Sequence, residues 1–370
     1  MKISDITSRK ILNSAGKWTI ETKVVLDDSS IGIASVPGGI SKGKREVVAL
    51  EAEESVKKIE EIKPQVVNKD FANINDFDSF LIGLDGTKEK SKLGGNTILS
   101  ASIAFCKAMA KANKKEVHEY LAEIAGNKDK PKRPQMMVLI LEGGTHGSGN
   151  ASIQEFMAIV NSVERGMEIY TKVKDELHEK GESTNVGAEG AFSPASFNND
   201  QVLTLLSQFL EGERIALDVA ASSFEPGTDI PNYESFMLNY PIASIEDPYG
   251  EDEWDNWEAF GKHYNERILV VTDDLTTTNP ETLQEAIKKS VGNAILVKPN
   301  QIGSVSETMN VVKMAHENGW KTIISHRGTD TNDDFVADFA VGVRSDYVKF
   351  GAPARGERVA KYNRLLEIFS

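Results

Sequence analysis

The order of apolar and polar positions along the chain divides it into two parts with different predicted elements. Residues 19–26 alternate in part, as a strand with one buried face does, and residues 31–36 resume a strand after a polar turn. Helical patterns follow these strands, at residues 46–62, 76–82 and 97–111. Because strands that are followed by helices are typical of the α+β class, we expect residues 1–126 to form an α+β domain.

A polar stretch with prolines lies between this part and the rest of the chain. Residues 127–134 read NKDKPKRP, and we expect them to form a linker. From residue 135 onward, short apolar runs alternate with helical patterns, which is typical of consecutive strand and helix units. The region 135–370 is close in length to the ~250 residues that a barrel of eight such units usually takes.

Eight polar residues recur at near-constant spacing, and most of them directly follow an apolar run. Intervals of 23 to 34 residues separate Glu155, Glu189, Asp218, Glu246, Asp273, Lys298, His326 and Lys349. One strand with its crossover helix takes roughly 25–30 residues, so the spacing indicates one polar residue per β/α unit. Side chains at the ends of many parallel strands meet at one point only when the sheet closes. This favours a (β/α)8-type barrel over an open, doubly wound sheet.

Composition and charge limit the classes of function. The formal net charge of −14 at pH 7 argues against a nucleic-acid-binding surface and disfavours attraction to an anionic membrane. No run approaches the ~18 apolar residues that would span a bilayer, and residues 1–12 lack the apolar segment of a signal peptide. The single cysteine, Cys106, lies in an apolar run, which indicates a core residue and fits a reducing, cytoplasmic location.

Three of the eight recurring residues indicate a metal site. Asp218, Glu246 and Asp273 end consecutive apolar runs at intervals of 28 and 27 residues. Carboxylates that are brought together repel one another, so such a site needs a cation, and all-oxygen ligation favours Mg²⁺ over Zn²⁺. The alternative is that each carboxylate caps a helix or faces solvent.

The cationic members indicate acid–base chemistry. Lys298 and Lys349 follow apolar runs, and a buried lysine beside a divalent cation should have a lowered pKa and could act as a base. The alternative is a structural pair with the metal-binding carboxylates. The adjacent His326 and Arg327 offer a hydrogen-bond donor and a planar anion clamp.

Two glycine-rich segments carry further candidates. Residues 143–147 (GGTHG) form a loop that contains His146, and residues 187–190 (GAEG) present Glu189 on a turn. A neutral Glu189 would suit a general acid, although glycines by themselves indicate only a turn.

Several longer motifs resemble one family along nearly the whole chain. The most specific are SIEDP at residues 244–248, TDDLTTTNP at 272–280, VKPNQIG at 297–303, SHR at 325–327 and GAPARGERVAKYNRLL at 351–366. These motifs are similar to those of the enolase family, the phosphopyruvate hydratases of glycolysis. The resemblance implies a lyase that reversibly dehydrates 2-phosphoglycerate to phosphoenolpyruvate, and the chain resembles a short, divergent member of that family.

The resemblance implies catalytic roles for five of the candidates. Lys298 matches the base that removes the proton α to the substrate carboxylate. Glu189 matches the acid that assists departure of the hydroxyl group, with Glu155 beside it. Lys349 matches the contact to the substrate carboxylate, and His146 matches a histidine of the lid.

The resemblance also implies two magnesium ions and a phosphate site. Asp218, Glu246 and Asp273 match the ligands of a first Mg²⁺. Ser41 matches the loop ligand of a second Mg²⁺, which would arrive with the substrate. The substrate would be a small phosphorylated acid, and the chain is expected to form a homodimer or a larger homo-oligomer. The residues expected to bind the substrate around its phosphate are His326, Arg327 and Gly328.

The chain departs from the family pattern at several positions near this site. Glu142 stands where the family usually has Asn, Ala188 where it has Asp, and Gly328 where it has Ser. The loop at residues 38–43 (GGISKG) also differs. Glu142 is expected to repel an anionic substrate, and Lys42 to offset that charge. These changes leave two alternatives open: an enolase-like lyase that eliminates water from another hydroxy acid, and a non-catalytic paralogue with a binding role.

Overall fold

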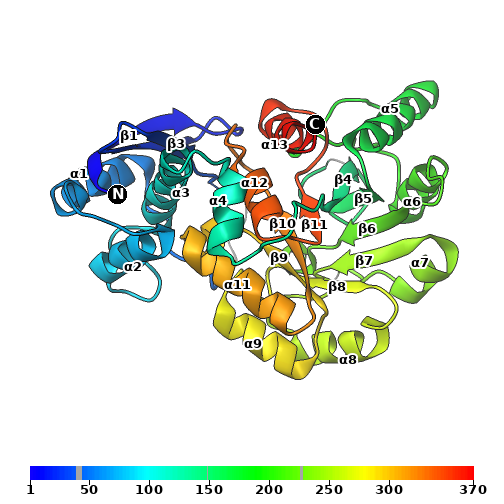
Figure 1. Cartoon of the computed structure of the whole chain (residues 1–370). Helices are drawn as coiled ribbons and strands as arrows, with labels where there is room; N and C mark the ends of the chain where they lie inside the picture. The colour runs from blue at the N-terminus through cyan, green and yellow to red at the C-terminus, as the bar shows by residue number, and fades with distance from the viewer. Residues whose placement is uncertain (39–43, 148, 226–227) are drawn as a thin grey trace.

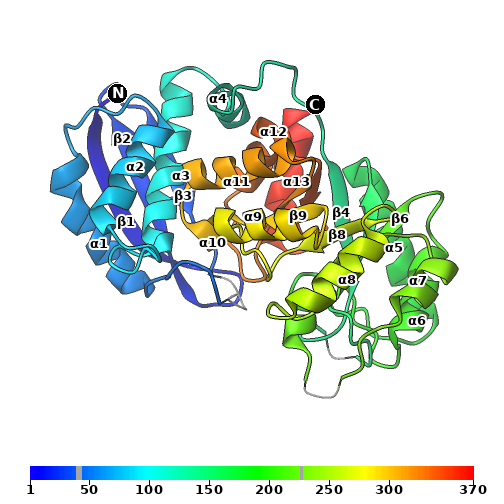
Figure 2. The same cartoon turned by 90° about the horizontal axis from the view of Figure 1, so that it is seen from below.

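Two regions lie side by side in the computed structural model, which describes residues 1–38, 44–147, 149–225 and 228–370 (Figure 1). A three-stranded sheet with its helices forms the first region, and a closed barrel of eight strands forms the second. Both views place the N-terminal sheet on one side of the barrel, with the helices α2 (Ile74–Asp85) and α3 (Gly95–Ala112) next to α11 (Val305–Glu317) (Figures 1 and 2). This confirms the prediction of a barrel preceded by a smaller α+β domain.

The first region is built on a short antiparallel sheet. Its strands pair in the order β1 (Ile3–Leu12), β2 (Trp18–Leu26) and β3 (Ile31–Ser35). Its helices are α1 (Ala52–Val66), α2 (Ile74–Asp85), α3 (Gly95–Ala112) and α4 (Val117–Ile124). The helix α3 is buried along nearly its whole length, because β2 and β3 cover one side and barrel helices cover another. Gly32 of β3 permits this contact, since a Cβ there would lie 1.9 Å from the carbonyl oxygen of Ala104.

The start of α1 differs from the sequence prediction. The apolar pattern predicts a helix over residues 46–62, whereas the helix begins at Ala52 and ends at Val66. The segment before it is held by tertiary contacts, because the Val47 N–H donates to the carbonyl oxygen of Gln301 at 3.0 Å. A local periodicity cannot reveal such a contact, which fixes the backbone outside the helical region.

The barrel closes in the order β10-β11-β4-β5-β6-β7-β8-β9. Its strands are β4 (Gln135–Glu142), β5 (Glu155–Val160), β6 (Arg214–Asp218), β7 (Ile242–Glu246), β8 (Leu269–Thr272), β9 (Ala294–Val297), β10 (Lys321–Ser325) and β11 (Tyr347–Lys349). Its helices are α5 (Val163–Glu179), α6 (Asn199–Ser207), α7 (Tyr233–Asn239), α8 (Trp254–Tyr264), α9 (Pro280–Lys289), α10 (Pro299–Ile302), α11, α12 (Phe335–Gly342) and α13 (Gly356–Ile368). A short 3₁₀ helix, η1 (Ala221–Ser223), follows β6.

The strand β5 departs from the expected regular series of β/α units. It pairs antiparallel with both β4 and β6, while the other neighbouring pairs of the barrel are parallel. The described residues between β4 and β5 contain no helix, so these strands form a hairpin and both α5 and α6 follow β5. Because β5 is reversed, its first residue, Glu155, lies at the same rim as the last residues of β4 and β6, Glu142 and Asp218.

Polar side chains join the two regions at the start of α11. Asp78 of α2 accepts a hydrogen bond from the Ser306 N–H at 2.8 Å, and Ser102 of α3 accepts one from the Val305 N–H at 3.1 Å. The first region therefore supplies acceptors for amides that the first turn of a helix leaves unpaired. Cys106 is buried in α3, and burial raises the pKa of its thiol well above the ordinary value, as suits a core residue.

Residues 127–134 contain neither helix nor strand and lie between α4 and β4. We propose them as the linker between an N-terminal domain of residues 1–126 and a barrel domain of residues 135–370. Among the residues that the structure describes, no helix is long and apolar enough to cross a membrane.

Candidate active site

A polar cavity of about 250 Å³ opens at the rim of the barrel where the parallel strands end. Most of the residues singled out in the sequence line it: His146, Glu155, Glu189, Asp218, Asp273, Lys298, His326, Arg327, Gly328 and Lys349. Glu246 is buried nearby and reaches the cavity through its contact with Lys349. Ser41, expected to bind a second metal ion, lies outside the described residues.

A row of carboxylates crosses four neighbouring strands at this rim. The strand register pairs Glu142 with Glu155, Glu155 with Asp218, and Asp218 with Glu246. Asp273 follows directly after β8, the next strand along. Each of these side chains is buried, so every member of the row that is ionised places negative charge where water is scarce, and a cation is needed to stabilise it.

Lys349 supplies one of these cations. Its ammonium group donates to Asp218 Oδ2 at 2.8 Å and to both carboxylate oxygens of Glu246 at 2.9 Å. It also lies 3.2 Å from Glu155 Oε2. Burial alone would lower the pKa of Lys349, but these three carboxylates outweigh it and hold the pKa well above its ordinary value. The lysine is therefore protonated at neutral pH.

Lys298 supplies a second cation. Its ammonium group donates to Asp273 Oδ2, and Gln301 Nε2 donates to the other oxygen of the same carboxylate at 3.0 Å. Burial lowers the pKa of Lys298, but the charge of Asp273 outweighs burial, and the net shift is upward. A metal ion bound to Asp273 would compete with Lys298 for this carboxylate. It would weaken the pair that keeps Lys298 protonated and so favour the neutral form that acts as a base.

In this structure Lys349 and Lys298 pair with Asp218, Glu246 and Asp273, whose side chains have the donor chemistry of a magnesium site. They offer only oxygen donors, which is the donor set that Mg²⁺ prefers. In addition, Asp218 Oδ1 is buried without a hydrogen-bond partner among the described residues, which leaves a lone pair free for an ion.

A second acidic group lies beside this triad and was missed by the sequence reasoning. Carboxylate oxygens of Asp247, Asp273 and Asp274 lie within 4.8 Å of one another. Burial raises the pKa of Asp247 well above its ordinary value, and burial with the charge of Asp273 raises the pKa of Asp274 to about 7. Their positions directly after Glu246 and Asp273 were a signal that could have identified both.

Asp247 also orders its neighbours through the backbone. It accepts hydrogen bonds from the N–H groups of Asp273 at 3.0 Å and Asp274 at 2.9 Å. Its own backbone has a φ of 44°, in the left-handed region that non-glycine residues seldom adopt. The contact ties the end of β7 to the segment after β8 and so fixes the carboxylate of Asp273.

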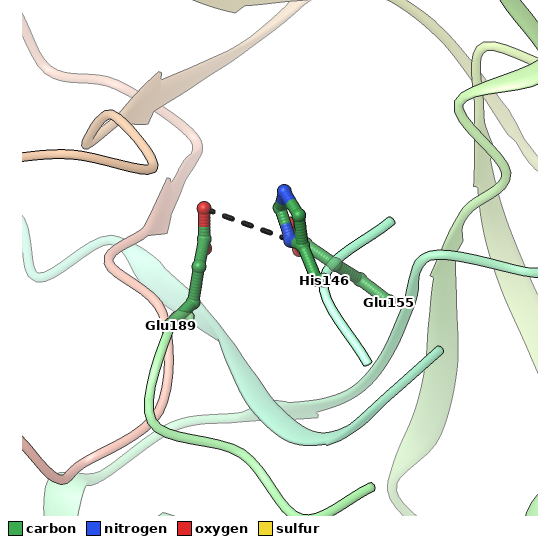
Figure 3. A group of neighbouring side chains, drawn as sticks. All are labelled: His146, Glu155 and Glu189. Atoms are coloured by element: carbon green, nitrogen blue, oxygen red, sulfur yellow. Dashed lines mark ion pairs between the residues drawn. The ribbon is translucent and has the colours of Figure 1, made fainter. Parts of the chain in front are cut away.

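Another wall of the cavity carries a histidine between two glutamates, and one of them, Glu155, also belongs to the carboxylate row. His146, Glu155 and Glu189 come from three segments and point toward one another (Figure 3). His146 Nδ1 lies 3.8 Å from Glu155 Oε1 and 3.9 Å from Glu189 Oε1, and His326 Nε2 lies 2.8 Å from Glu189 Oε2. Groups that exchange protons readily are thus within reach of one another, which suits proton transfer.

Burial and neighbouring charges set the protonation of these groups. Burial raises the pKa of Glu155 well above its ordinary value, with Glu189 and Asp218 adding to the shift. Burial also raises the pKa of Glu189, but His326 and His146 outweigh it and hold the pKa well below. Burial lowers the pKa of His326 to about 4. The buried proton of this wall therefore rests on Glu155, and Glu189 is ionised, so Glu189 has to gain a proton before it can act as a general acid.

Arg327 is oriented by the N-terminal region. Its guanidinium group donates to both oxygens of Glu46, at 3.0 and 3.2 Å, and to Asn300 Oδ1 at 3.3 Å. Arg358 of α13, another residue that the sequence reasoning missed, donates to the carbonyl oxygens of Arg327 and Gly328 at 2.7 and 2.6 Å. The segment that carries His326, Arg327 and Gly328 is thus held from two sides.

The departures from the family pattern lie in different places. Gly328 lines the cavity, and Ala188 is half-buried in the turn that carries Glu189. Glu142 is buried behind that turn and does not line the cavity, and its pKa is raised to about 8, so it is neutral at pH 7. A neutral carboxyl outside the cavity gives no support to the expectation that Glu142 repels an anionic substrate. Lys42 lies outside the described residues.

Fold and site together define an α/β-barrel protein with an acidic, lysine-bearing cavity at the rim of its barrel. Residues 3–121 match the family described as "Enolase, N-terminal domain", and residues 132–231 and 228–370 match "Enolase, C-terminal TIM barrel domain". The enolase of Elusimicrobium minutum (strain Pei191) is 38% identical over 403 residues, which cover 99% of this chain and 95% of the relative.

The chain belongs to the enolase family and is a lyase of the phosphopyruvate hydratase type. The match extends over nearly the whole of both chains, so it gives no support to the expectation of a short member. Enolases use Mg²⁺, and the carboxylates at the rim could bind it.

Proposed function

We propose that this chain catalyses the reversible dehydration of 2-phosphoglycerate to phosphoenolpyruvate. The observation that carries the proposal is that one cavity has lysines and carboxylates on one wall and a glutamate with a histidine on another. Lys298 and Lys349 lie on the wall with the metal-binding carboxylates, and Glu189 lies with His146 on the other. A substrate bound between them would present a carbon-bound proton to one wall and a hydroxyl group to the other.

Lys298 is the proposed base. It lies at the end of β9 and pairs with Asp273, so its side chain is held toward the cavity by a rigid strand. The proton α to a carboxylate is weakly acidic, and its removal shifts the electron pair of the C–H bond onto the carboxylate. Lys349 is the proposed contact for that carboxylate, because a fixed cation stabilises the charge where it develops.

Magnesium is the proposed cofactor, with two ions per site. Asp218, Glu246 and Asp273 would hold the first, and the second would arrive with the substrate, with Ser41 as the proposed loop ligand. Bound Mg²⁺ would stabilise the negative charge on the substrate carboxylate.

Glu189 is proposed to assist departure of the hydroxyl group, with Glu155 and His146 as its partners. Glu189 is ionised in this state and Glu155 holds a proton, so a proton has to move within this wall before the hydroxyl group leaves as water. The distances of 3.8 and 3.9 Å from His146 to the two glutamates make the histidine a suitable carrier. The C–O bond then breaks, and its electron pair leaves with the hydroxyl oxygen.

Arg327, His326 and Gly328 are proposed to bind the phosphate end of the substrate. The pairing of Arg327 with Glu46 is the observation that favours a second candidate, because the positive charge that a phosphate needs is already partly neutralised. The second candidate is an enolase-like lyase that eliminates water from another hydroxy acid. A non-catalytic paralogue would not need Lys298, Glu189 and Lys349 together.

We further propose that the chain works in the cytoplasm as a homodimer or a larger homo-oligomer. Leu12 and Trp18, which pair across β1 and β2, are exposed and would suit an interface. Sedimentation of the purified chain would test the assembly.

The reaction itself is tested with 2-phosphoglycerate and Mg²⁺. The ultraviolet absorbance of the enol phosphate product should appear, and chelation of the metal should stop it. No product from 2-phosphoglycerate, together with water loss from an unphosphorylated hydroxy acid, would favour the second candidate.

A further inference from the structure

Glu142 touches the turn that carries Glu189 at two points. Its Oε2 accepts a hydrogen bond from the backbone N–H of Glu189 at 3.3 Å. Its Oε1 lies only 1.6 Å from the position that a Cβ on Gly187 would occupy. The carboxyl group therefore fills the hollow beneath residues 187–190, and glycine at position 187 is what makes room for it.

We propose that Glu142 is a positioning residue for Glu189, holding the 187–190 turn so that the Glu189 side chain faces the cavity. The proposal rests on the proposed role of Glu189 and adds a residue that does not touch the substrate. Glu142 is well placed for this, because it ends β4 and its own N–H is bound to the carbonyl oxygen of Phe192 at 2.9 Å. The rigid barrel is thereby connected to both sides of the turn.

Other contacts hold carbonyl groups of the turn, and the N–H of Gly187 donates to the carbonyl oxygen of Ala191 at 2.9 Å. Tyr170 donates to the carbonyl oxygen of Gly190 at 2.7 Å, and Arg355 donates to that of Gly187 at 3.2 Å. The N–H of Ala352 donates to the carbonyl oxygen of Glu189 at 3.1 Å. Glu142 is the acceptor for the amide of Glu189 itself, so its loss leaves a buried N–H unpaired next to the catalytic side chain.

The protonation of Glu142 gives this role a measurable signature. Burial raises the pKa of Glu142 to about 8, and the charge of Glu189 adds to the shift. The titratable and charged groups that face it from neighbouring elements are Glu189 and His146 in the loops, Glu155 on β5, Tyr170 on α5, and Arg355 and Arg358 at α13. Above pH 8 Glu142 becomes a second buried anion beside Glu189, and repulsion between them displaces the turn.

Turnover should therefore fall at alkaline pH for a reason that lies outside the cavity. Glu142 does not line the cavity, so its ionisation should lower kcat and leave KM for the substrate nearly unchanged. Replacing Glu142 with glutamine keeps the shape and the acceptor oxygen but cannot ionise. The Glu142→Gln variant should turn over substrate at neutral pH and lose this alkaline decline.

The first experiment measures kcat and KM from about pH 6 to about pH 9.5 for the wild type, Glu142→Gln and the control Glu54→Gln, whose site is exposed on α1. A group with a pKa of about 8 is neutral in roughly a tenth of molecules at pH 9. Between pH 7 and pH 9 the kcat of the wild type should thus fall roughly tenfold more than that of Glu142→Gln. Alkaline limbs that coincide for all three proteins would overturn the proposal.

A second measurement separates this inference from the proposed function. The raised pKa means that the folded state binds the proton of Glu142 more tightly than the unfolded state does. The free energy of unfolding should therefore decline as pH rises from about 4.5 to about 8. The Tm of the wild type should fall more steeply over that range than the Tm of Glu142→Gln. If 2-phosphoglycerate is not turned over, the proposed function fails while this comparison still decides the state of Glu142. Parallel Tm curves would overturn the inference.

Discussion

The ammonium group of Lys349 lies 2.8 Å from Oδ2 of Asp218, although β4 and β5 separate their strands in the barrel order. The contact crosses the mouth of the barrel and joins the last strand to the first of the proposed metal ligands. It means that the lysine and the metal ion depend on the same carboxylates. The stability of the metal-free protein and its affinity for Mg²⁺ are therefore coupled.

Replacing Lys349 with methionine should destabilise the metal-free protein. The substitution leaves the buried carboxylates of Asp218, Glu246 and Glu155 without their cation, and breaking a buried pair from one side costs roughly 3–5 kcal/mol. Urea unfolding with and without Mg²⁺ measures this, and the deficit should shrink when the metal is present. Lys172→Ala, which removes a surface pair with Glu168 on α5, serves as control and should cost less than ~1 kcal/mol. Equal stability of Lys349→Met and the wild type without metal would contradict the pairing.

Asp218→Asn should weaken Mg²⁺ binding. Asp218 offers a buried oxygen without a hydrogen-bond partner among the described residues, and the amide removes the charge that attracts the ion. We expect the Kd for Mg²⁺, measured by calorimetry without substrate, to rise at least roughly tenfold, equivalent to about 1.4 kcal/mol. Asp175→Asn, at an exposed position on α5, should bind as the wild type does. An unchanged Kd for Asp218→Asn would indicate that Mg²⁺ binds at Asp247 and Asp274 instead.

Asp78 should make the contact between the two regions sensitive to pH. Burial raises its pKa to about 6, so the folded state binds its proton more tightly than the unfolded state does. Stability should then fall as pH rises from about 4 to about 6, by up to about 3 kcal/mol for a shift of this size. Asn keeps an acceptor for the Ser306 N–H, so Asp78→Asn should abolish this slope in thermal unfolding. If Asp78→Asn keeps the pH dependence of the wild type, another titratable group is responsible for it.

Gly328→Ser should lower KM for 2-phosphoglycerate with little change in kcat. Gly328 lines the cavity beside the proposed phosphate clamp, and a hydroxyl group there can donate to a charged oxygen. Such a bond contributes roughly 1.5–3 kcal/mol at most, and binding gained away from the reacting atoms acts on KM. Steady-state kinetics provide the measurement. An unchanged or raised KM would favour a substrate without a phosphate.

The sequence was most informative where an apolar strand ends in a polar residue. The runs before Asp218, Glu246 and Lys298 could be recognised as strands because they are short and mostly apolar, and nearly all of their residues are buried, as a parallel barrel requires. Their convergence then followed from the closure of the sheet.

Other features depend on tertiary contacts that leave no local pattern. The reversed direction of β5 depends on whether a hairpin or a helix joins it to β4, and the apolar run of β5 is the same in either case. Glu142 and Asp247 act through the backbone amides of Glu189 and Asp273, which lie 47 and 26 residues away in the chain. The raised pKa of Lys298 follows from its pair with Asp273. The sequence predicted only that these two residues line the same cavity, and not that they contact each other.

The most direct test of the account follows the α-proton of 2-phosphoglycerate in deuterated water with Mg²⁺ by NMR. The wild type should exchange this proton with solvent. Lys298→Ala should not exchange it, because the base is gone, whereas Glu189→Gln should block formation of phosphoenolpyruvate and retain some exchange. Folded Lys298→Ala protein that exchanges the proton at the wild-type rate would contradict the assignment of Lys298, and with it the division of the cavity into a base wall and an acid wall.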